Sequence, residues 1–385
     1  MGAMAYVIDS PAHDAFNKLS TGLFSFGYKN IVKKFVFSMT PDDAHEATMT
    51  FARNAGRVAP LMWLLREMID YTDPILETNV MGVDFVNPFG LSAGLDKNCD
   101  LPACLDNAGF GFETVGSTTA RPCPGNPRPW FHRLPEYASM MVHVGLANDG
   151  SEQVIARAEK AYTKAKTMKM SVSIARTNDD LTGDLDEGIE DYRISMERAA
   201  GRTAMIEVNI SCPNTKVGEP FVIPENLDRL FDTLDTVSHP GQPVLVKMPQ
   251  YLPWEKFREL VDVLTDHKVD GLSIANLRKD RTGLNIPRDW QGNLSGLPTI
   301  GGSNELIERT YRDYGDRFAI AGIGGVFTPE QAYRKIRLGS SLVMFISSLM
   351  YRGPQNITTL KRGLAELLRR DGFDNVSQAV GVDVR

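Results

Sequence analysis

The sequence predicts an α/β protein, a closed (β/α)8 TIM barrel with an N-terminal helical extension. From about residue 85 onward, short runs rich in Val, Ile, Ala and Ser alternate with helical patterns. The runs are almost continuously apolar, as strands buried on both faces of a parallel sheet require. Each run ends in a residue able to bind or react, and a parallel barrel gathers such residues at one rim.

We expect eight barrel strands. They are Phe89–Gly94, Phe112–Ser117, Met170–Ala175, Ala204–Ile210, Val244–Met248, Gly271–Asn276, Phe318–Ile323 and Ser341–Ser347. An open doubly wound sheet is the alternative, but eight repeats with no G-x-G-x-x-G after the first strand disfavour it. We therefore divide the chain into a helical extension, residues 1–80, and a barrel domain, residues 81–385.

The extension contains two helical patterns. Thr40 and Pro41 are typical of a helix start, and the first pattern runs from Ala44 to Asn54. The second, Ala59–Ile69, places four apolar side chains on one face, which must be buried against something: Leu61, Leu64, Leu65 and Met68. That face either packs on the barrel or stays partly exposed for a lipophilic partner or a membrane surface.

Composition excludes several classes of protein. A net charge of −6 and a pI near 5.6, with no basic stripe, argue against a nucleic-acid partner. The four cysteines form no C-x-x-C pair, so we expect neither a disulfide framework nor a metal site, and a reducing cytoplasm fits best. No apolar stretch is long enough to span a bilayer, although peripheral membrane contact stays open.

Two segments are expected to be loops at the barrel mouth. The proline-rich segment Pro122–Arg133 follows the second strand, and the long, polar segment Leu277–Pro298 follows the sixth. Loops of that length are uncommon unless they cover a site.

Potentially functional residues end every expected strand. They are Gly94 to Lys97, Gly116 and Ser117, Arg176, Cys212 with Asn214, Lys247, Asn276, Gly322 to Gly325, and Ser347. After the last two strands, Gly324, Gly325 and Ser347 stand where barrels commonly bind phosphate, although tight turns explain many glycine runs.

Two lysines at the rim suggest an anionic cofactor. Lys247 lies between apolar Val246 and Met248, so it must point into the barrel if they point outward. An ammonium there, like that of Lys97, would favour the reduced and negatively charged form of a flavin. The alternative for either lysine is a solvated or salt-bridged side chain.

Cys212 follows a buried strand and precedes Pro213 and Asn214. An inert, buried thiol is the commonest fate of a free cysteine. Its place at a strand end favours a catalytic base instead, provided that the environment lowers the thiol pKa.

Several motifs carry a resemblance to a known family. They are G-L-S-A-G-L-D-K-N, G-N-P-R-P-W-F-H-R-L, N-I-S-C-P-N, N-L-S-G-L-P, and A-G-I-G-G-V followed by S-S-L-V-M-F. Through these motifs, in order over nearly the whole chain, the sequence resembles the dihydroorotate dehydrogenases. The extension resembles that of the membrane-associated, quinone-reducing class 2 enzymes, so the resemblance implies an FMN-containing barrel with a quinone as a potential electron acceptor.

The resemblance also implies roles for individual residues. Cys212 would be the base, with Lys247 beside the reacting flavin. The implied flavin contacts are Ala93, Gly94, Lys97, Ser117, Ser173, Asn209, Lys247, Gly296, Gly324, Gly325 and Ser347. The implied substrate contacts are Asn209, Asn214 and Asn276.

Some residues depart from the class 2 pattern. Cys212 replaces a serine and is a feature of class 1, and Ser173 stands where a flavin-binding asparagine is expected. Val142, Leu277 and Arg278 stand at positions facing substrate, where Arg278 could capture a carboxylate and the apolar pair would leave ring atoms unsatisfied. Two alternatives therefore stay open: the same flavin chemistry on another amide- or carbonyl-containing small molecule, and a non-redox barrel that binds a phosphorylated ligand.

Overall fold

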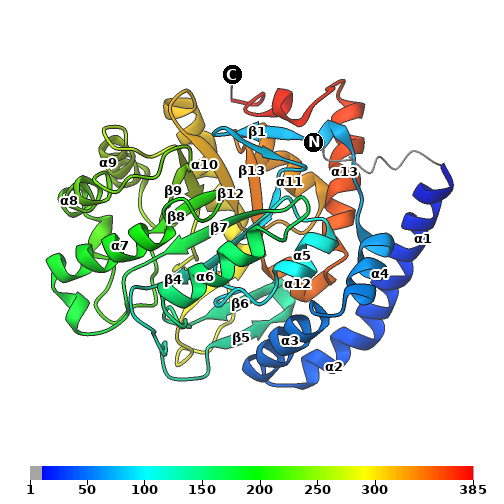
Figure 1. Cartoon of the computed structure of the whole chain (residues 1–385), viewed down its shortest axis with the longest axis horizontal. Coiled ribbons are helices and arrows are strands. Elements are labelled where there is room, and N and C mark those ends of the chain that lie inside the picture. The colour runs from blue at the N-terminus through cyan, green and yellow to red at the C-terminus, as the bar shows by residue number, and fades with distance from the viewer. Residues whose placement is uncertain (1–10, 385) are drawn as a thin grey trace.

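A closed parallel barrel forms the centre of the computed structural model, which describes residues 11–384 (Figure 1). In these residues its strands are β3 (Phe89–Leu91), β4 (Phe112–Thr118), β7 (Lys169–Ile174), β8 (Met205–Asn209), β9 (Val244–Lys247), β10 (Gly271–Ile274), β12 (Ala319–Ile323) and β13 (Leu342–Phe345). Each pairs in parallel with its neighbours, and β13 closes the barrel on β3. The predicted TIM barrel is confirmed, and every expected strand overlaps one of these eight.

Helices cover the outside of the barrel. They are α5 (Pro102–Ala108), α6 (Ser151–Tyr162), α7 (Leu185–Ala199), α8 (Pro224–Leu234), α9 (Trp254–Leu264), α10 (Ile300–Tyr314), α11 (Pro329–Arg337), α12 (Ser347–Arg352) and α13 (Asn356–Arg370). Short 3-10 turns lie at Pro74–Leu76, Pro135–Tyr137, Leu181–Gly183, Pro220–Val222, Leu297–Thr299 and Val376–Ala379. Buried aliphatic side chains fill the layer between helices and strands, which makes this layer the main core.

A small hairpin packs against the interior residues of the barrel. Strands β1 (Thr78–Val80) and β2 (Val83–Phe85) pair antiparallel, and the expected boundary after residue 80 falls in the turn between them. Val80 and Phe85 pack against interior residues that include Phe112, Met205 and Leu245. The hairpin therefore caps the amino-terminal end of the barrel, opposite the rim where the strands end.

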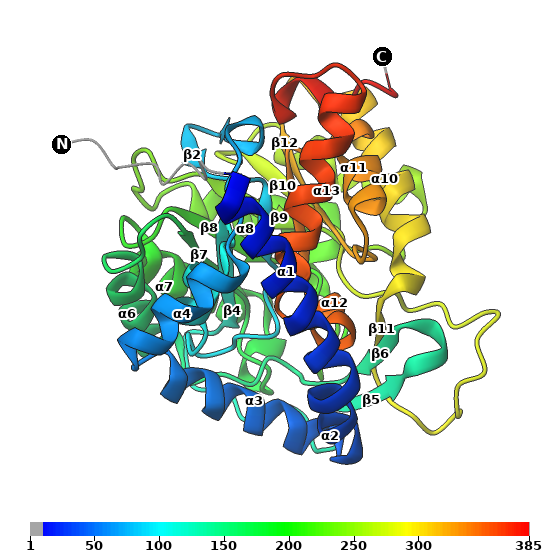
Figure 2. The same ribbon diagram turned by 90° about the vertical axis from the view of Figure 1, so that its right-hand side faces the viewer.

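A second sheet lies at that rim. Strands β5 (Phe131–Leu134), β6 (Ser139–Val142) and β11 (Asn293–Gly296) pair antiparallel in the order β11-β6-β5. The segments expected to be loops supply its two outer strands, because β5 begins inside Pro122–Arg133 and β11 lies inside Leu277–Pro298. The rest of the second segment stands out beside this sheet as the yellow loop in Figure 2.

Four helices precede the barrel and lie along one side of it (Figures 1 and 2). They are α1 (Pro11–Gly27), α2 (Lys33–Ser38), α3 (Pro41–Ala55) and α4 (Ala59–Ile69), and a π-helical stretch, Tyr28–Val32, joins the first two. The Thr40 hydroxyl accepts a hydrogen bond from Asp43 N and caps α3, as its sequence predicts. None of the helices in residues 11–384 is both long and apolar enough to cross a membrane.

The apolar face expected on α4 divides into two parts. Leu65 and Met68 pack against the core, whereas Leu61 and Leu64 are 40% and 46% exposed. The expectation that the whole face is buried is therefore wrong for Leu61 and Leu64. The physical reason is that α1 covers only one side of α4, so the side nearer Leu61 faces an open cavity and solvent.

A buried ion pair fastens these helices to the barrel. The Lys361 ammonium on α13 donates to Asp70 Oδ1 at 2.8 Å and to the Gly109 carbonyl at 2.9 Å. Asp70 ends α4, and its own carbonyl accepts a hydrogen bond from Asn17 on α1 at 2.9 Å. Burial lowers the pKa of Lys361 and Asp70 opposes that change, so the ammonium depends on its carboxylate partner.

Lys361→Met should therefore lower the free energy of unfolding by about 3–5 kcal/mol, because it leaves the nearly buried Asp70 carboxylate with only Arg66 Nε, 3.8 Å away, as an ionic partner. Urea unfolding followed by circular dichroism measures the change. Lys256→Gln is the matched control, because it removes an exposed Lys256–Glu259 pair and should cost less than about 1 kcal/mol. Equal midpoints for the two variants would contradict the anchoring role.

Candidate active site

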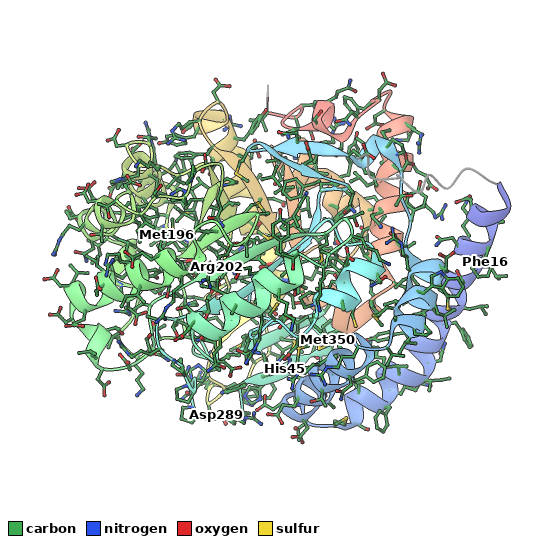
Figure 3. All side chains as sticks on the ribbon, in the orientation of Figure 1. Phe16, His45, Met196, Arg202, Asp289 and Met350 are labelled. Carbon is green, nitrogen blue, oxygen red and sulfur yellow. The ribbon has the colours of Figure 1, made fainter. Side chains whose placement is uncertain are left out.

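A cavity of about 920 Å³ connects the carboxyl ends of the barrel strands with the N-terminal helices. Its inner part is lined by polar residues and main chain from the strand ends. Its outer part is apolar and is lined by Phe24, Val32, Phe35, Met39 and Leu61 from the first helices. Figure 3 labels two of the lining residues, His45 on α3 and Met350 on α12.

Most residues expected at the site line this cavity. Those that do are Ala93, Gly94, Lys97, Ser117, Val142, Asn209, Cys212, Asn214, Lys247, Asn276, Leu277, Gly296, Gly324, Gly325 and Ser347. Ser173 lies behind the wall, where its hydroxyl shares a 2.7 Å hydrogen bond with that of Ser117. The structure does not bring Arg278 to the cavity, because its guanidinium donates to the Pro298 carbonyl and to Asp280.

Gly324 and Gly325 form a cradle that no side chain can enter. Their φ angles are +94° and +73°. A Cβ would lie 2.3 Å from Thr299 Oγ1 at Gly324 and 2.4 Å from Ile300 Cβ at Gly325. Main chain therefore lines the cavity here, with Ser347 nearby on the next strand end. This arrangement fits a phosphate, which main-chain N–H groups bind well at close approach.

Lys247 points into the barrel, as its flanking residues predict. Its ammonium lies 3.4 Å from the Ala93 carbonyl and 3.9 Å from Glu207 Oε1. Both side chains of that pair are buried, and Glu207 Oε1 accepts no hydrogen bond from the described residues. The ammonium thus keeps hydrogen-bonding capacity for an anionic group in the cavity.

Lys97 forms the junction between the polar and apolar parts of the cavity. Its ammonium lies 2.8 Å from His45 Nε2 and over the rings of Trp130 and Phe131. Burial lowers the pKa of Lys97 to about 8, and burial together with Lys97 and Arg128 lowers the pKa of His45 to about 3. Neutral His45 therefore accepts a hydrogen bond from the charged lysine. Sequence reasoning missed His45, whose only signal was its place in the first turns of a predicted helix.

Cys212 lines the cavity, and its side chain is partly exposed there. Burial raises the pKa of its thiol to about 11, Glu219 adds to the rise, and the Asn214 N–H and Lys247 oppose it. The sequence analysis required an environment that lowers this pKa, and the protein without ligand does the opposite. Desolvation outweighs the nearby ammonium because the thiolate loses its water while Lys247 is shared with Glu207.

Asparagines that sequence reasoning missed hold the expected substrate residues in place. Asn293 Nδ2 donates to Asn214 Oδ1, and Asn126 Nδ2 donates to the Asn214 carbonyl, each at 2.8 Å. With its oxygen occupied, Asn214 keeps its Nδ2 as a donor toward the cavity. Asn293 stands opposite Val142 in the β11–β6 register, so an amide lies next to the apolar residue. The signal in the sequence was N-L-S-G at the end of a long polar segment.

Gly325→Ala should abolish tight binding of a phosphate-bearing flavin, because the new methyl group collides with Ile300 and strains a positive-φ residue. We expect at least a hundred-fold loss of FMN affinity, measured by quenching of flavin fluorescence. Gly301→Ala is the matched control, since a Cβ at Gly301 meets no atom within 4 Å. An unchanged affinity in Gly325→Ala would place the phosphate elsewhere.

Comparison with known proteins agrees with this geometry. The family model for dihydroorotate dehydrogenase matches residues 75–368. A dihydroorotate dehydrogenase (quinone) of Nocardia farcinica is 34% identical over 363 residues, which are 92% of this chain and 97% of the relative. The enzyme of that name from Synechocystis is 32% identical, over 87% of this chain and 89% of the relative. The one from Halobacterium salinarum is 33% identical, over 92% of this chain and 99% of the relative.

Solved structures show the same similarity. The DHODH of Eimeria tenella in complex with ferulenol superposes with a TM-score of 0.81 at 27% identity, over 90% of this chain and 96% of that one. Its ligand-free form gives a TM-score of 0.80, with 90% and 99% covered. On the family match and these relatives together, the chain belongs to the dihydroorotate dehydrogenase family.

Proposed function

We propose that this protein oxidises dihydroorotate to orotate, with FMN as cofactor and a quinone as electron acceptor. The observation that carries the proposal is the single cavity that joins Cys212, Lys247 and the asparagines at the strand ends to an apolar outer part between the N-terminal helices. Family membership supports the reaction, and neither alternative left open by the sequence gains support from the relatives.

The residues present fit FMN. The cradle at Gly324 and Gly325 would hold the phosphate, and Lys247 would lie beside the part of the ring that becomes negative on reduction. When bound, FMN supplies the acceptor for the two electrons that leave the substrate as a hydride. Ser117 would contact the ring. Its hydroxyl is held in place because it accepts a hydrogen bond from Asn209 Nδ2 at 2.8 Å and shares another with the Ser173 hydroxyl.

The chain's own residues provide substrate binding and proton removal. Asn209, Asn214 and Asn276 line the cavity. Asn214 Nδ2 would donate to a carbonyl group of the ring, whereas Asn276 Nδ2 already donates to the Ser211 carbonyl at 2.8 Å and so fixes the wall of the site. Cys212 Sγ, as thiolate, would take the proton from the carbon next to the one that loses the hydride. Because burial keeps this thiol protonated at neutral pH, the fraction of active enzyme should grow as pH rises toward its pKa of about 11.

Cys212→Ala should keep its flavin but reduce it with dihydroorotate about 10²–10⁴-fold more slowly, the loss typical of a missing general base. Anaerobic stopped-flow absorbance of the bound flavin measures the rate. In the wild type the rate of flavin reduction should rise about ten-fold per pH unit below the thiol pKa. The rate in Cys212→Ser should approach the wild-type rate only at high pH. A wild-type rate in Cys212→Ala, or wild-type flavin that dihydroorotate never bleaches, would reject the proposal.

The apolar part of the cavity suits a quinone. One strong polar group lies in its wall: the Arg133 guanidinium donates through Nη1 and Nη2 to the carbonyls of Met39 and Val36, at 2.8 and 3.1 Å. Its Nε is buried and makes no hydrogen bond to the described residues. The tail of a quinone would lie among Phe24, Phe35 and Leu61.

The surface around this cavity suits peripheral contact with a membrane. Phe26, Ile31 and Phe35 are each at least 68% exposed, and Trp63 on α4 is 60% exposed. No acidic residue occurs between Asp14 and Asp42, whereas this segment carries four lysines, Lys18, Lys29, Lys33 and Lys34. Exposed aromatic and aliphatic side chains with flanking lysines are typical of helices that lie in a bilayer interface.

Replacing Phe26 and Phe35 together by serine should weaken binding to phospholipid vesicles at least ten-fold, because each ring loses about 1.5–3 kcal/mol of apolar burial in the interface. Co-sedimentation with vesicles measures the binding. Leu181→Ser is the matched control, since Leu181 is 54% exposed but precedes α7, far along the chain from the helical extension. Binding that is equally strong in all three proteins would contradict the membrane proposal.

A further inference from the structure

Two loops border the substrate end of the cavity. The loop after β8 carries Cys212 and continues to Glu219. The loop after β10 begins with Asn276 and Leu277, which line the cavity, and continues to Lys279. Close to the barrel, Asn276 Nδ2 joins the loops by donating to the Ser211 carbonyl at 2.8 Å. Farther out, the distance between the loops depends on other contacts.

Glu219 and Lys279 make such a contact. The Lys279 ammonium forms an ion pair with Glu219 Oε2, and the Glu219 side chain is only 8% exposed. The same ammonium lies 3.4 Å from the centre of the Tyr251 ring, which belongs to the loop after β9. Residues that follow three consecutive barrel strands, β8, β9 and β10, therefore meet at one ion pair, in which Glu219 is nearly buried and the Lys279 side chain is 36% exposed.

This ion pair differs from the exposed pairs elsewhere on the molecule. Burial raises the pKa of Glu219, and Lys279 and Tyr251 oppose that change. A carboxylate in this position depends on its partner, because a single buried charge is far more costly than a pair. The contact therefore holds more firmly than a pair formed in solvent.

The rest of the catalytic loop is fastened on its other side. Arg176, at the end of β7, donates to the Gly218 carbonyl at 3.0 Å, and Lys216 N donates to Asn178 Oδ1 at 2.8 Å. These bonds connect the loop to the β7 side of the rim. Among the described side chains, the Lys279–Glu219 pair is the ionic connection to the β10 side.

We propose that Glu219 and Lys279 form a latch that holds the Cys212 loop against the loop after β10 and so keeps Cys212 away from bulk water. Both are positioning residues, since neither lines the cavity. The role of the latch in catalysis rests on the proposed function. Its effect on the reactivity of Cys212, however, is measurable without substrate.

The groups that face Cys212 determine what opening the latch would do. They are Glu219 on its own loop, Lys247 on β9, Arg176 after β7, Tyr192 on α7 and Cys123 after β4. Burial is the largest cause of the raised thiol pKa. An open loop would hydrate the thiol and lower that pKa toward its ordinary value near 8.5, which enlarges the thiolate fraction at pH 8.

The test is alkylation of the purified, flavin-loaded full chain by iodoacetamide between pH 6 and pH 11, with each cysteine followed by mass spectrometry. Lys279→Gln and Glu219→Gln should each alkylate Cys212 at least ten-fold faster than the wild type at pH 8, with a lower midpoint in the pH profile. The charge-reversed double variant Glu219→Lys, Lys279→Glu should return toward the wild-type rate. Lys256→Gln, which breaks a remote exposed pair, should leave it unchanged.

Buried Cys123 reports on general unfolding in the same samples. Single variants in which Cys212 reacts within two-fold of the wild type would overturn the latch. If Cys123 is also alkylated in a single variant, the charge-reversed variant decides between the two explanations. Slow alkylation of Cys212 in that variant supports the latch. Fast alkylation of Cys212 there, with Cys123 unmodified, overturns it. Failure of dihydroorotate to bleach the flavin would reject the proposed reaction and leave this result unaffected.

Discussion

The parallel register of the eight-stranded barrel is the constraint on which the site depends. Because every strand runs in the same direction, the residues that follow β3, β4, β7, β8, β9, β10, β12 and β13 all emerge at one rim. Lys97, Cys212 and Gly325 are far apart in sequence, yet they line one cavity. The β1–β2 hairpin and buried residues such as Phe112 fill the opposite end, so the rim is the open end of the barrel.

Burial inside the protein has opposite effects on the two groups. Burial lowers the pKa of Lys97 to about 8 and raises that of Cys212 to about 11. Burial therefore strengthens the electrostatic effect of Lys247 on any bound anion and at the same time makes the Cys212 thiol, the proposed base, harder to ionise. On the proposed function, the loops around Cys212 would take part in the chemistry, because their position would determine how much thiolate exists at a given pH.

The sequence predicted the features that depend on short stretches of residues and on the gathering of strand ends at one rim of a parallel barrel. Strand ends, the N-cap Thr40 and the inward direction of Lys247 belong to this group. Ser173 and Arg278 show the limit of that reasoning, since sequence position does not tell whether a side chain meets the cavity, another serine or a nearby carbonyl. The rim sheet and Asn293 were missed for a related reason: four-residue strands gain stability from pairing across a long loop, and local propensity does not encode that pairing.

The N-terminal helices complete the active site although they contain none of the residues proposed for chemistry. Buried Asp42 at the start of α3 accepts hydrogen bonds from the main-chain N–H groups of Trp130 and Phe131, which ties the helices to the rim sheet at one end. Lys361 and Asp70 tie them to the barrel at the other end. Between these two attachments the helices leave an apolar space open to the surface, where exposed rings gather. The proposed substrate and acceptor would then use opposite ends of one cavity. The inner end offers amide groups to a polar ring, whereas the outer end offers only apolar surface over most of its wall and so favours an apolar molecule.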